Sequence, residues 1–232
     1  MSSSWLPLES TPEVLTPFVR KLGCPAPWGF TDVFGLDDEL LAMVPQPCAA
    51  LVLLFPCAAI SAERPRELRR EAPPQNMFFA QQHDDCGNAC GTIAIIHSVA
   101  NAAASGRLAL DAGPLADLIR DAPRDVAARG RALVAADKIR DLSNSTAAAG
   151  ETRGAGTDDN QGQHYVALVE VDGSLWELDG RNLGEDGVAF PVCHGPTSSA
   201  TFLADAAAVI KHDFVSRDPT NLNFSILAFA QL

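Results

Sequence analysis

The stretch "HDDCGNACGT", residues 83–92, holds two cysteines, Cys86 and Cys90, directly before an apolar run. That run, "GTIAIIHSVANAAA", is apolar on nearly every face and predicts a buried helix that starts at Cys90. Backbone N–H groups and the positive end of the dipole at a helix N-terminus favour a thiolate over a thiol. Cys90 is therefore the candidate nucleophile. We expect Cys86 to line the loop, with a redox role as its alternative.

A histidine and an aspartate that could serve this thiolate lie on one predicted hairpin. In "HYVALVEVDGSLWELDG", two β-rich runs are joined by Asp172-Gly173, a strong two-residue turn signal. This register places His164 opposite Arg181 and makes His164 and Asp179 diagonal neighbours on one face, about 7 to 8 Å apart at Cα. We therefore predict a hydrogen bond between His164 and Asp179, which a bulge or a three-residue loop would prevent.

Together these residues predict a Cys–His–Asp triad in the chain order of papain-like enzymes, with Asp179 fixing the tautomer of His164. An acetyltransferase or transglutaminase shares that order and is the alternative enzyme class. A zinc site from His83, Cys86, Cys90 and His97 is disfavoured, because the C-x₃-C spacing lacks a second ligand pair of the usual kind. His97 lies two helical turns beyond Cys90, about 10.5 Å along the axis, and is expected to be a core histidine.

The elements that must position these residues are read from periodicity and turn signals. We expect helices over residues 11–23, within "DVFGLDDELLAMVP", over 113–122 and 123–141, and near 201–214. Strands are expected at "AALVLLF", "NMFFA" and "NFSILAFAQ". Residues 141–162 lose their large apolar side chains after Leu142 and exceed the roughly 12 to 15 residues usual for a structureless connection, so they predict a mobile lid.

Charge and length limit the class of protein further. The 232 residues carry a net charge of −12, which disfavours a nucleic acid or an anionic membrane as partner and favours a basic one. No secretory signal or membrane span is recognisable, so we expect one soluble, cytoplasmic domain over residues 1–232. In a reducing compartment its six cysteines are expected to be thiols.

Several segments resemble the ubiquitin carboxyl-terminal hydrolases of the short, single-domain kind. They are "WLPLES", "MVPQP", "NACGTIA", "HYVALVEVDGSLWELDGR" and "SRDPTNLNFSILA". The resemblance runs from Trp5 to the C-terminus and is weakest over residues 61–75 and 141–162. It implies a papain-like α/β/α fold with a central, mainly antiparallel sheet and a knotted backbone.

The resemblance implies a thiol protease that cleaves adducts at the C-terminal glycine of ubiquitin, or of NEDD8, without a metal or an organic cofactor. Cys90 matches the nucleophile, His164 the general base and acid, and Asp179 the residue that orients the histidine. The segment at about 141–163 matches a loop that crosses the active-site cleft. A non-catalytic ubiquitin-binding protein with a dormant site is the alternative, and we expect a monomer.

One position departs from the family. Its oxyanion-binding glutamine lies six residues before the nucleophile, where this chain has Asp84. A carboxylate would oppose the developing negative charge, whereas an amide donor is worth about 2.7 to 4 kcal/mol. An insertion of two residues within "HDDCG" makes Gln82 the expected donor, and Gln81 would need three. The N–H of Cys90 is the expected second donor.

The resemblance also suggests residues for ubiquitin binding. Asp32 matches an acidic residue that contacts ubiquitin in relatives, and a solvated loop residue is the other interpretation. Pro7 and Leu8 match an N-terminal segment that lines the binding surface. The negative net charge would attract the basic face of ubiquitin.

Overall fold

The chain is built around one six-stranded sheet in the order β1-β6-β2-β3-β4-β5, in which every neighbouring pair is antiparallel. The computed structural model describes residues 4–60, 70–150 and 162–232. The strands are β1 (Trp28–Asp32), β2 (Cys48–Pro56), β3 (Gln163–Val171), β4 (Ser174–Leu178), β5 (Val192–Pro196) and β6 (Ser225–Gln231). The continuous apolar run in β2 fits its place inside the sheet, between β6 and β3.

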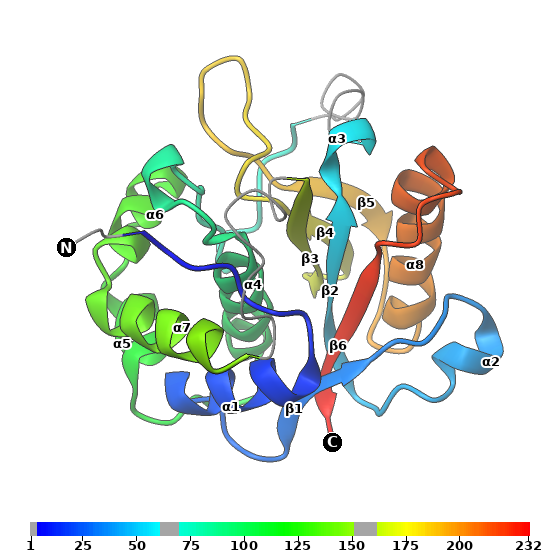
Figure 1. The fold of residues 1–232 in the computed structure, drawn as a ribbon, viewed down its shortest axis with the longest axis horizontal. Helices are drawn as coiled ribbons and strands as arrows, with labels where there is room; N and C mark the ends of the chain where they lie inside the picture. Colours follow the sequence, from blue (N-terminus) through cyan, green and yellow to red (C-terminus); the bar gives the residue numbers. More distant parts are fainter. Residues whose placement is uncertain (1–3, 61–69, 151–161) are drawn as a thin grey trace.

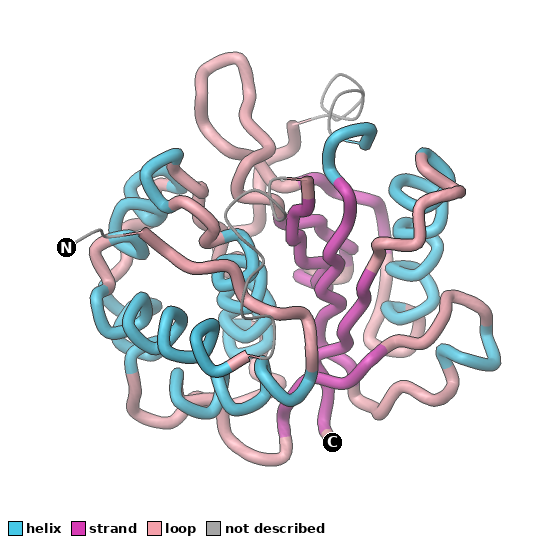
Figure 2. Tube along the Cα trace, in the orientation of Figure 1, coloured by secondary structure: helices cyan, strands magenta, loops and turns pink. Residues whose placement is uncertain are grey.

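Helices cover both faces of this sheet (Figures 1 and 2). One face carries α1 (Pro12–Leu22), α4 (Cys90–Ala104), α5 (Pro114–Asp121), α6 (Val126–Val134) and α7 (Asp137–Ala149), with a shared core. A second core lies on the other face, where α2 (Asp38–Leu41) and α8 (Phe202–Val209) pack. The short helix α3 (Cys57–Ile60) follows β2. Three further short helical segments are η2 (Asp84–Cys86), η3 (Ile210–Phe214) and η4 (Val215–Arg217). The predicted α/β/α architecture is confirmed, and the knot stays a prediction.

The predicted hairpin is present with its predicted register. Val171 pairs with Ser174 and Ala167 with Leu178 across the Asp172-Gly173 turn, where both residues have positive φ. The ladder ends at Leu178, so His164 does not pair with Arg181. Instead, His164 lies opposite Phe55 on β2.

Several sequence predictions differ from the structure, and the single helix expected over residues 123–141 is divided into α6 and α7. The segment "NMFFA" begins in a turn and forms no strand, because side chains from α4 and α6 take up its backbone groups. The predicted lid begins too early, since α7 continues through Ala149, and residues 151–161 lie outside the described residues. Strands β1 and β5 were not predicted. Asp32 thus ends a strand, and the helix expected after it is limited to α2.

Helices long and apolar enough to cross a lipid bilayer do not occur in the described part of the chain.

Candidate active site

Cys90 is the first residue of α4 and is half-buried. The first turn of this helix contains no acidic residue, and no described side chain caps its N-terminus. The dipole of a 15-residue helix therefore acts on the sulfur without competition from a capping carboxylate. This is the position that the sequence predicted for a nucleophile.

The glycine after the nucleophile lets α4 approach the sheet closely. A Cβ atom on Gly91 would lie 3.2 Å from the ring of Tyr165, the residue that follows His164 on β3. The hydroxyl of Tyr165 donates a hydrogen bond to the carbonyl of Leu8 (2.9 Å) and fixes the ring in place. Contact at Gly91 brings the start of α4 against the start of β3, and hence Cys90 to His164.

The predicted bond between the histidine and the aspartate is confirmed. Nε2 of His164 and Oδ1 of Asp179 are 2.7 Å apart. The same Oδ1 accepts the backbone N–H of Arg181 at 2.8 Å, which holds the carboxylate still. The imidazole packs edge-on against Phe55, with ring centroids 5.8 Å apart, and is almost fully buried.

The sulfur and the imidazole shift each other's ionisation. Burial alone raises the pKa of the Cys90 thiol, but the hydrogen bond and charge of His164, with help from Arg181, hold that pKa below its ordinary value. Burial alone lowers the pKa of His164, but the Asp179 carboxylate and then the Cys90 sulfur raise it to about 10. Both directions favour a thiolate–imidazolium pair near neutral pH.

The nitrogen of His164 that is available to Cys90 is Nδ1, because Nε2 is taken by Asp179. Nδ1 is buried and makes no hydrogen bond of strict geometry within the described residues, so its interaction with the sulfur is a loose one. Loose contacts of this kind are common in free enzymes and tighten when substrate is bound.

Cys86 has the opposite character. Its side chain is buried, and burial, with the nearby Asp85 carboxylate, raises the pKa of its thiol. It therefore stays a protonated thiol at neutral pH, which makes it a poor nucleophile. The structure favours Cys90 as the reactive cysteine of the two.

Gln82 lies beside the turn that follows Asp179, and the side chain of Gln81 bonds a different loop. The backbone N–H of Gln82 donates to the carbonyl of Gly180 at 2.8 Å, and its Nε2 donates to the carbonyl of Gly87 at 3.2 Å. One amide hydrogen is thus left over for an oxyanion. The amide of Gln81 is occupied by Gly187 and Ala189, at 3.2 Å each. Asp84, at the position of the family's glutamine, is exposed.

Two residues of this site were not predicted from the sequence. Arg181 fixes Asp179 through its N–H and lowers the pKa of Cys90 through its charge. Gly180 keeps Gln82 against the triad, because a Cβ atom there would lie 2.8 Å from the N atom of Gln82. The D-G-R sequence after β4 was the available signal, since glycine permits a close backbone approach.

The residues expected to bind ubiquitin have different exposures. Asp32 is exposed at the end of β1, and Pro7 is partly exposed. Leu8 is only 4% exposed and belongs to the core beneath the N-terminal segment, so its side chain is a packing residue. The prediction that Leu8 lines a binding surface does not fit this burial, whereas Leu6, two residues earlier, is 43% exposed.

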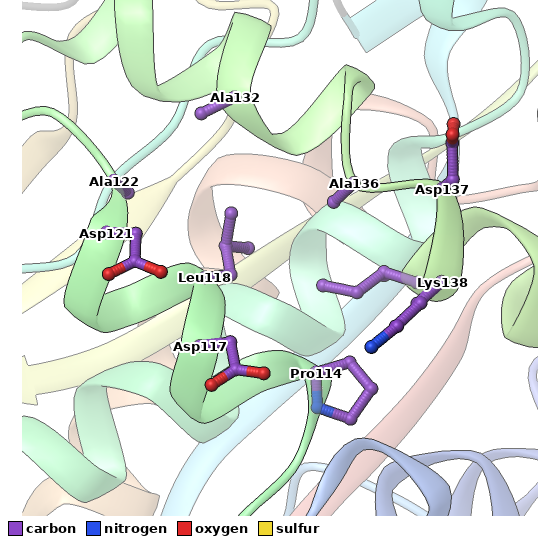
Figure 3. A pocket seen from close by; sticks show the side chains of 10 residues that line it. Pro114, Asp117, Leu118, Asp121, Ala122, Ala132, Ala136, Asp137 and Lys138 are labelled. Carbon is purple, nitrogen blue, oxygen red and sulfur yellow. The ribbon is translucent and has the colours of Figure 1, made fainter.

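A separate groove of about 300 Å³ lies between α5, α6 and α7, away from the triad (Figure 3). Leu118 and Ile139 are among its apolar lining, and Asp117 and Asp121 at its edge are ion-paired with Arg120. It holds no cysteine or histidine. Within the described residues, no cluster of three or more potential metal ligands was found.

The profile of the family described as ubiquitin carboxyl-terminal hydrolase, family 1, matches residues 5–215. The chain is 41% identical to a ubiquitin carboxyl-terminal hydrolase of Drosophila melanogaster, over 97% of this chain and 96% of that relative. This chain belongs to the ubiquitin carboxyl-terminal hydrolase family. It is 34% identical to isozyme L1 of the same hydrolases in Homo sapiens, over 97% of each chain.

Solved structures of this hydrolase family share the fold. The UCH37 catalytic domain of Trichinella spiralis, crystallised with ubiquitin vinyl methyl ester, superposes with a TM-score of 0.73 at 24% identity and covers 98% of this chain and 95% of its own. The family resemblance inferred from the sequence is confirmed. As a family member the chain is a cysteine-type deubiquitinating hydrolase, which argues against the acetyltransferase or transglutaminase alternative.

Proposed function

We propose that this hydrolase cleaves ester, thioester, amide and small peptide adducts at the C-terminal glycine of ubiquitin, through Cys90, His164 and Asp179. The single observation that carries the proposal is the contrast between the two loop cysteines. The pKa of Cys90 is lowered beside a histidine that is itself bonded to Asp179 at 2.7 Å, while the pKa of Cys86 is raised by burial.

In the proposed first step, the Cys90 thiolate attacks the carbonyl carbon of the terminal glycine, and a C–S bond forms. The oxyanion that results accepts hydrogen bonds from Nε2 of Gln82 and from the N–H of Cys90. As the tetrahedral intermediate collapses, the His164 imidazolium gives its proton to the departing amine, alkoxide or thiolate. A thioester between Cys90 and ubiquitin remains.

In the second step, the neutral His164 takes a proton from water, whose oxygen attacks the thioester carbon. Collapse of this intermediate releases the Cys90 thiolate and the carboxylic acid of ubiquitin, which loses its proton to solvent, and the imidazolium is already restored. Asp179 keeps the ring in the orientation that both proton transfers need. The cycle requires no cofactor.

The test uses ubiquitin vinyl methyl ester on the full chain, with Cys90→Ala and Cys86→Ala as matched variants. We expect a covalent adduct in the wild type and in Cys86→Ala, and none in Cys90→Ala, by intact mass. An adduct that persists in Cys90→Ala and is lost in Cys86→Ala would falsify the assignment. The same assay with a NEDD8 probe compares the two modifiers.

Turnover of a fluorogenic ubiquitin ester separates this function from the non-catalytic alternative. A dormant binding protein would capture ubiquitin without releasing the fluorophore catalytically. The position of Gln82 supports turnover, because its backbone N–H bonds Gly180, one residue after Asp179, and its side-chain amide bonds Gly87, three residues before Cys90, despite the irregular "HDDCG" sequence. A cytoplasmic, monomeric enzyme remains part of the proposal.

A further inference from the structure

Residues 77–80, which lead to Gln82, are buried, yet they pair with no strand among the described residues. Side chains bond their backbone groups instead. Asn101 of α4 bonds both the N–H and the carbonyl of Phe78, at 2.9 Å each. Arg129 of α6 donates to the carbonyls of Met77 and Phe79, at 3.3 and 3.0 Å. Buried backbone groups need such partners, and these two side chains provide them for residues 77–79.

His97 provides the next contact toward the active site. Its Nε2 accepts the backbone N–H of Ala80 at 3.0 Å, two residues before Gln82. The ring is fully buried and lies against Phe79, with centroids 5.2 Å apart. Ala80 is therefore held to the same helix that begins with Cys90.

The other side of the ring faces the aspartate. Nδ1 of His97 is directed to the carbonyl of Leu178, the residue before Asp179, in a contact looser than a strict hydrogen bond. The two segments that His97 touches are also joined to each other, because the N–H of Gln82 donates to Gly180 at 2.8 Å. One imidazole thus links the helix of Cys90, the segment of Gln82 and the end of β4 at Asp179.

This arrangement requires a neutral ring with its proton on Nδ1, since Nε2 must accept from Ala80. Burial lowers the pKa of His97 to about 4 and keeps the ring neutral at physiological pH, although the charge of Asp179 acts in the opposite direction. The charge of Arg129 acts in the same direction as burial.

We propose that His97 is a positioning residue for the reaction, which fixes the amide of Gln82 relative to Asp179 and Cys90 without touching substrate. The inference rests on the proposed function. Displacement of a catalytic group by about 1 Å can slow a reaction about 100-fold. Loss of a positioning residue should therefore lower kcat more than it changes the affinity for ubiquitin.

Two substitutions of His97 test the contacts of its two ring nitrogens separately. In His97→Asn the amide reaches the position of Nδ1 and loses Ala80, whereas in His97→Gln it reaches the position of Nε2 and keeps Ala80. With a fluorogenic ubiquitin ester we expect kcat to fall about 10- to 100-fold in His97→Asn, with KM changed less than about twofold, and to be largely restored in His97→Gln.

The control is Asn101→Ala, which removes contacts to Phe78 one turn further along α4 and farther from Gln82. Urea denaturation gives the stability of each variant. We expect Asn101→Ala to lose stability and keep its kcat within about threefold of wild type. An equal loss of kcat in His97→Asn and in Asn101→Ala, at matched stability, would make the role of His97 merely structural and overturn the proposal.

A double-mutant cycle tests whether His97 acts through Gln82. The loss in kcat caused by His97→Asn should shrink at least about threefold when Gln82→Ala is already present, and fully additive losses would contradict the proposal. If His97→Asn does not fold, ¹⁵N NMR of the wild-type protein shows which ring nitrogen of His97 carries the proton. A proton on Nε2 would contradict the proposal, because that nitrogen could then not accept the N–H of Ala80. A wild type without any hydrolysis would instead reject the proposed function itself.

Discussion

Nε2 of His164 and Oδ1 of Asp179 meet at 2.7 Å, although the ladder between β3 and β4 ends at Leu178, one residue before the aspartate. The hairpin brings the two residues close, and the chain then leaves the ladder at Asp179. The N–H of Arg181 and the close packing at Gly180 fix the carboxylate beyond the end of the strand. Asp179 is therefore held by a turn beyond the end of β4, whereas His164 is held by its strand in the sheet.

Asp179→Asn should show how much the orientation of the histidine contributes. The amide cannot stabilise the imidazolium, and we expect kcat to fall about 10²- to 10⁴-fold with KM changed little, measured with a fluorogenic ubiquitin ester. Asp172→Asn is the matched control, because it makes the same chemical change on the same hairpin. Asp172 has φ 51°, and its carboxylate accepts a hydrogen bond from the amide of Asn76. Asparagine adopts positive φ readily, and its side-chain oxygen can accept the same hydrogen bond. A similar loss in both variants would assign the effect to the hairpin rather than to the triad.

Gln82→Ala and Gln81→Ala should separate the oxyanion donor from its neighbour. We expect Gln82→Ala to slow turnover of a ubiquitin ester about 10²- to 10³-fold, because a transition-state hydrogen bond is lost, while ubiquitin affinity is kept. Gln81→Ala frees the loop at Gly187 and Ala189 and should reduce thermal stability instead. Normal turnover in Gln82→Ala, measured as kcat beside a binding titration, would move the oxyanion role to another group.

The pH dependence of Cys90 alkylation follows from the two pKa shifts. The pKa of Cys90 lies below its ordinary value and that of His164 is raised to about 10, so the thiolate forms at a lower pH than in an ordinary cysteine. The rate of reaction with iodoacetamide, followed by mass at this residue, should therefore reach its plateau at a lower pH than the rate of an ordinary thiol. Turnover should decline at alkaline pH as the imidazolium loses its proton.

Asp179→Asn provides the contrast for this profile. Removal of the carboxylate lowers the pKa of His164, which weakens the ion pair and lets the pKa of Cys90 return toward its ordinary value. We expect the alkylation rate of this variant to rise steadily between about pH 7 and 9, as for a common thiol. A wild-type profile with that same rise would mean that the resting enzyme holds a neutral thiol.

The sequence was sufficient for the parts of the site that rest on local pattern. The apolar run after Cys90 indicated α4, and Asp172-Gly173 set the register that brings His164 toward Asp179. Both signals act within about twenty residues, where helix period and turn geometry determine the arrangement. The family resemblance then singled out Gln82 as the oxyanion residue.

Contacts between distant segments could not be predicted in this way. The segment "NMFFA" has the composition of a strand, but Asn101, His97 and Arg129 take its hydrogen bonds and no neighbouring strand does. Leu8 was assigned to a surface by similarity, while its burial depends on packing near Tyr165 and Gly91. In each case the deciding partner belongs to another element of the fold, and one sequence carries no period that reveals the contact.

We expect the carboxylate of Asp32 to contribute to ubiquitin binding through an ion pair at the surface. This side chain is exposed, and partial burial, with the charge of Glu13, raises its pKa above the ordinary value. A surface ion pair is worth about 0.2–1 kcal/mol, so Asp32→Asn should raise KM about two- to fivefold at low salt, with kcat unchanged.

Asp117→Asn on α5 removes the same charge from a distant exposed site and serves as the control. If Asp32 contacts ubiquitin directly, KM should rise in Asp32→Asn alone, and the difference from wild type should vanish at about 0.5 M NaCl, where the Debye length is only a few ångströms. Equal effects of both substitutions would mean that the net charge of −12 attracts ubiquitin at long range without a specific contact at Asp32. Initial rates across a salt series, at fixed enzyme and varied ubiquitin ester, distinguish these outcomes.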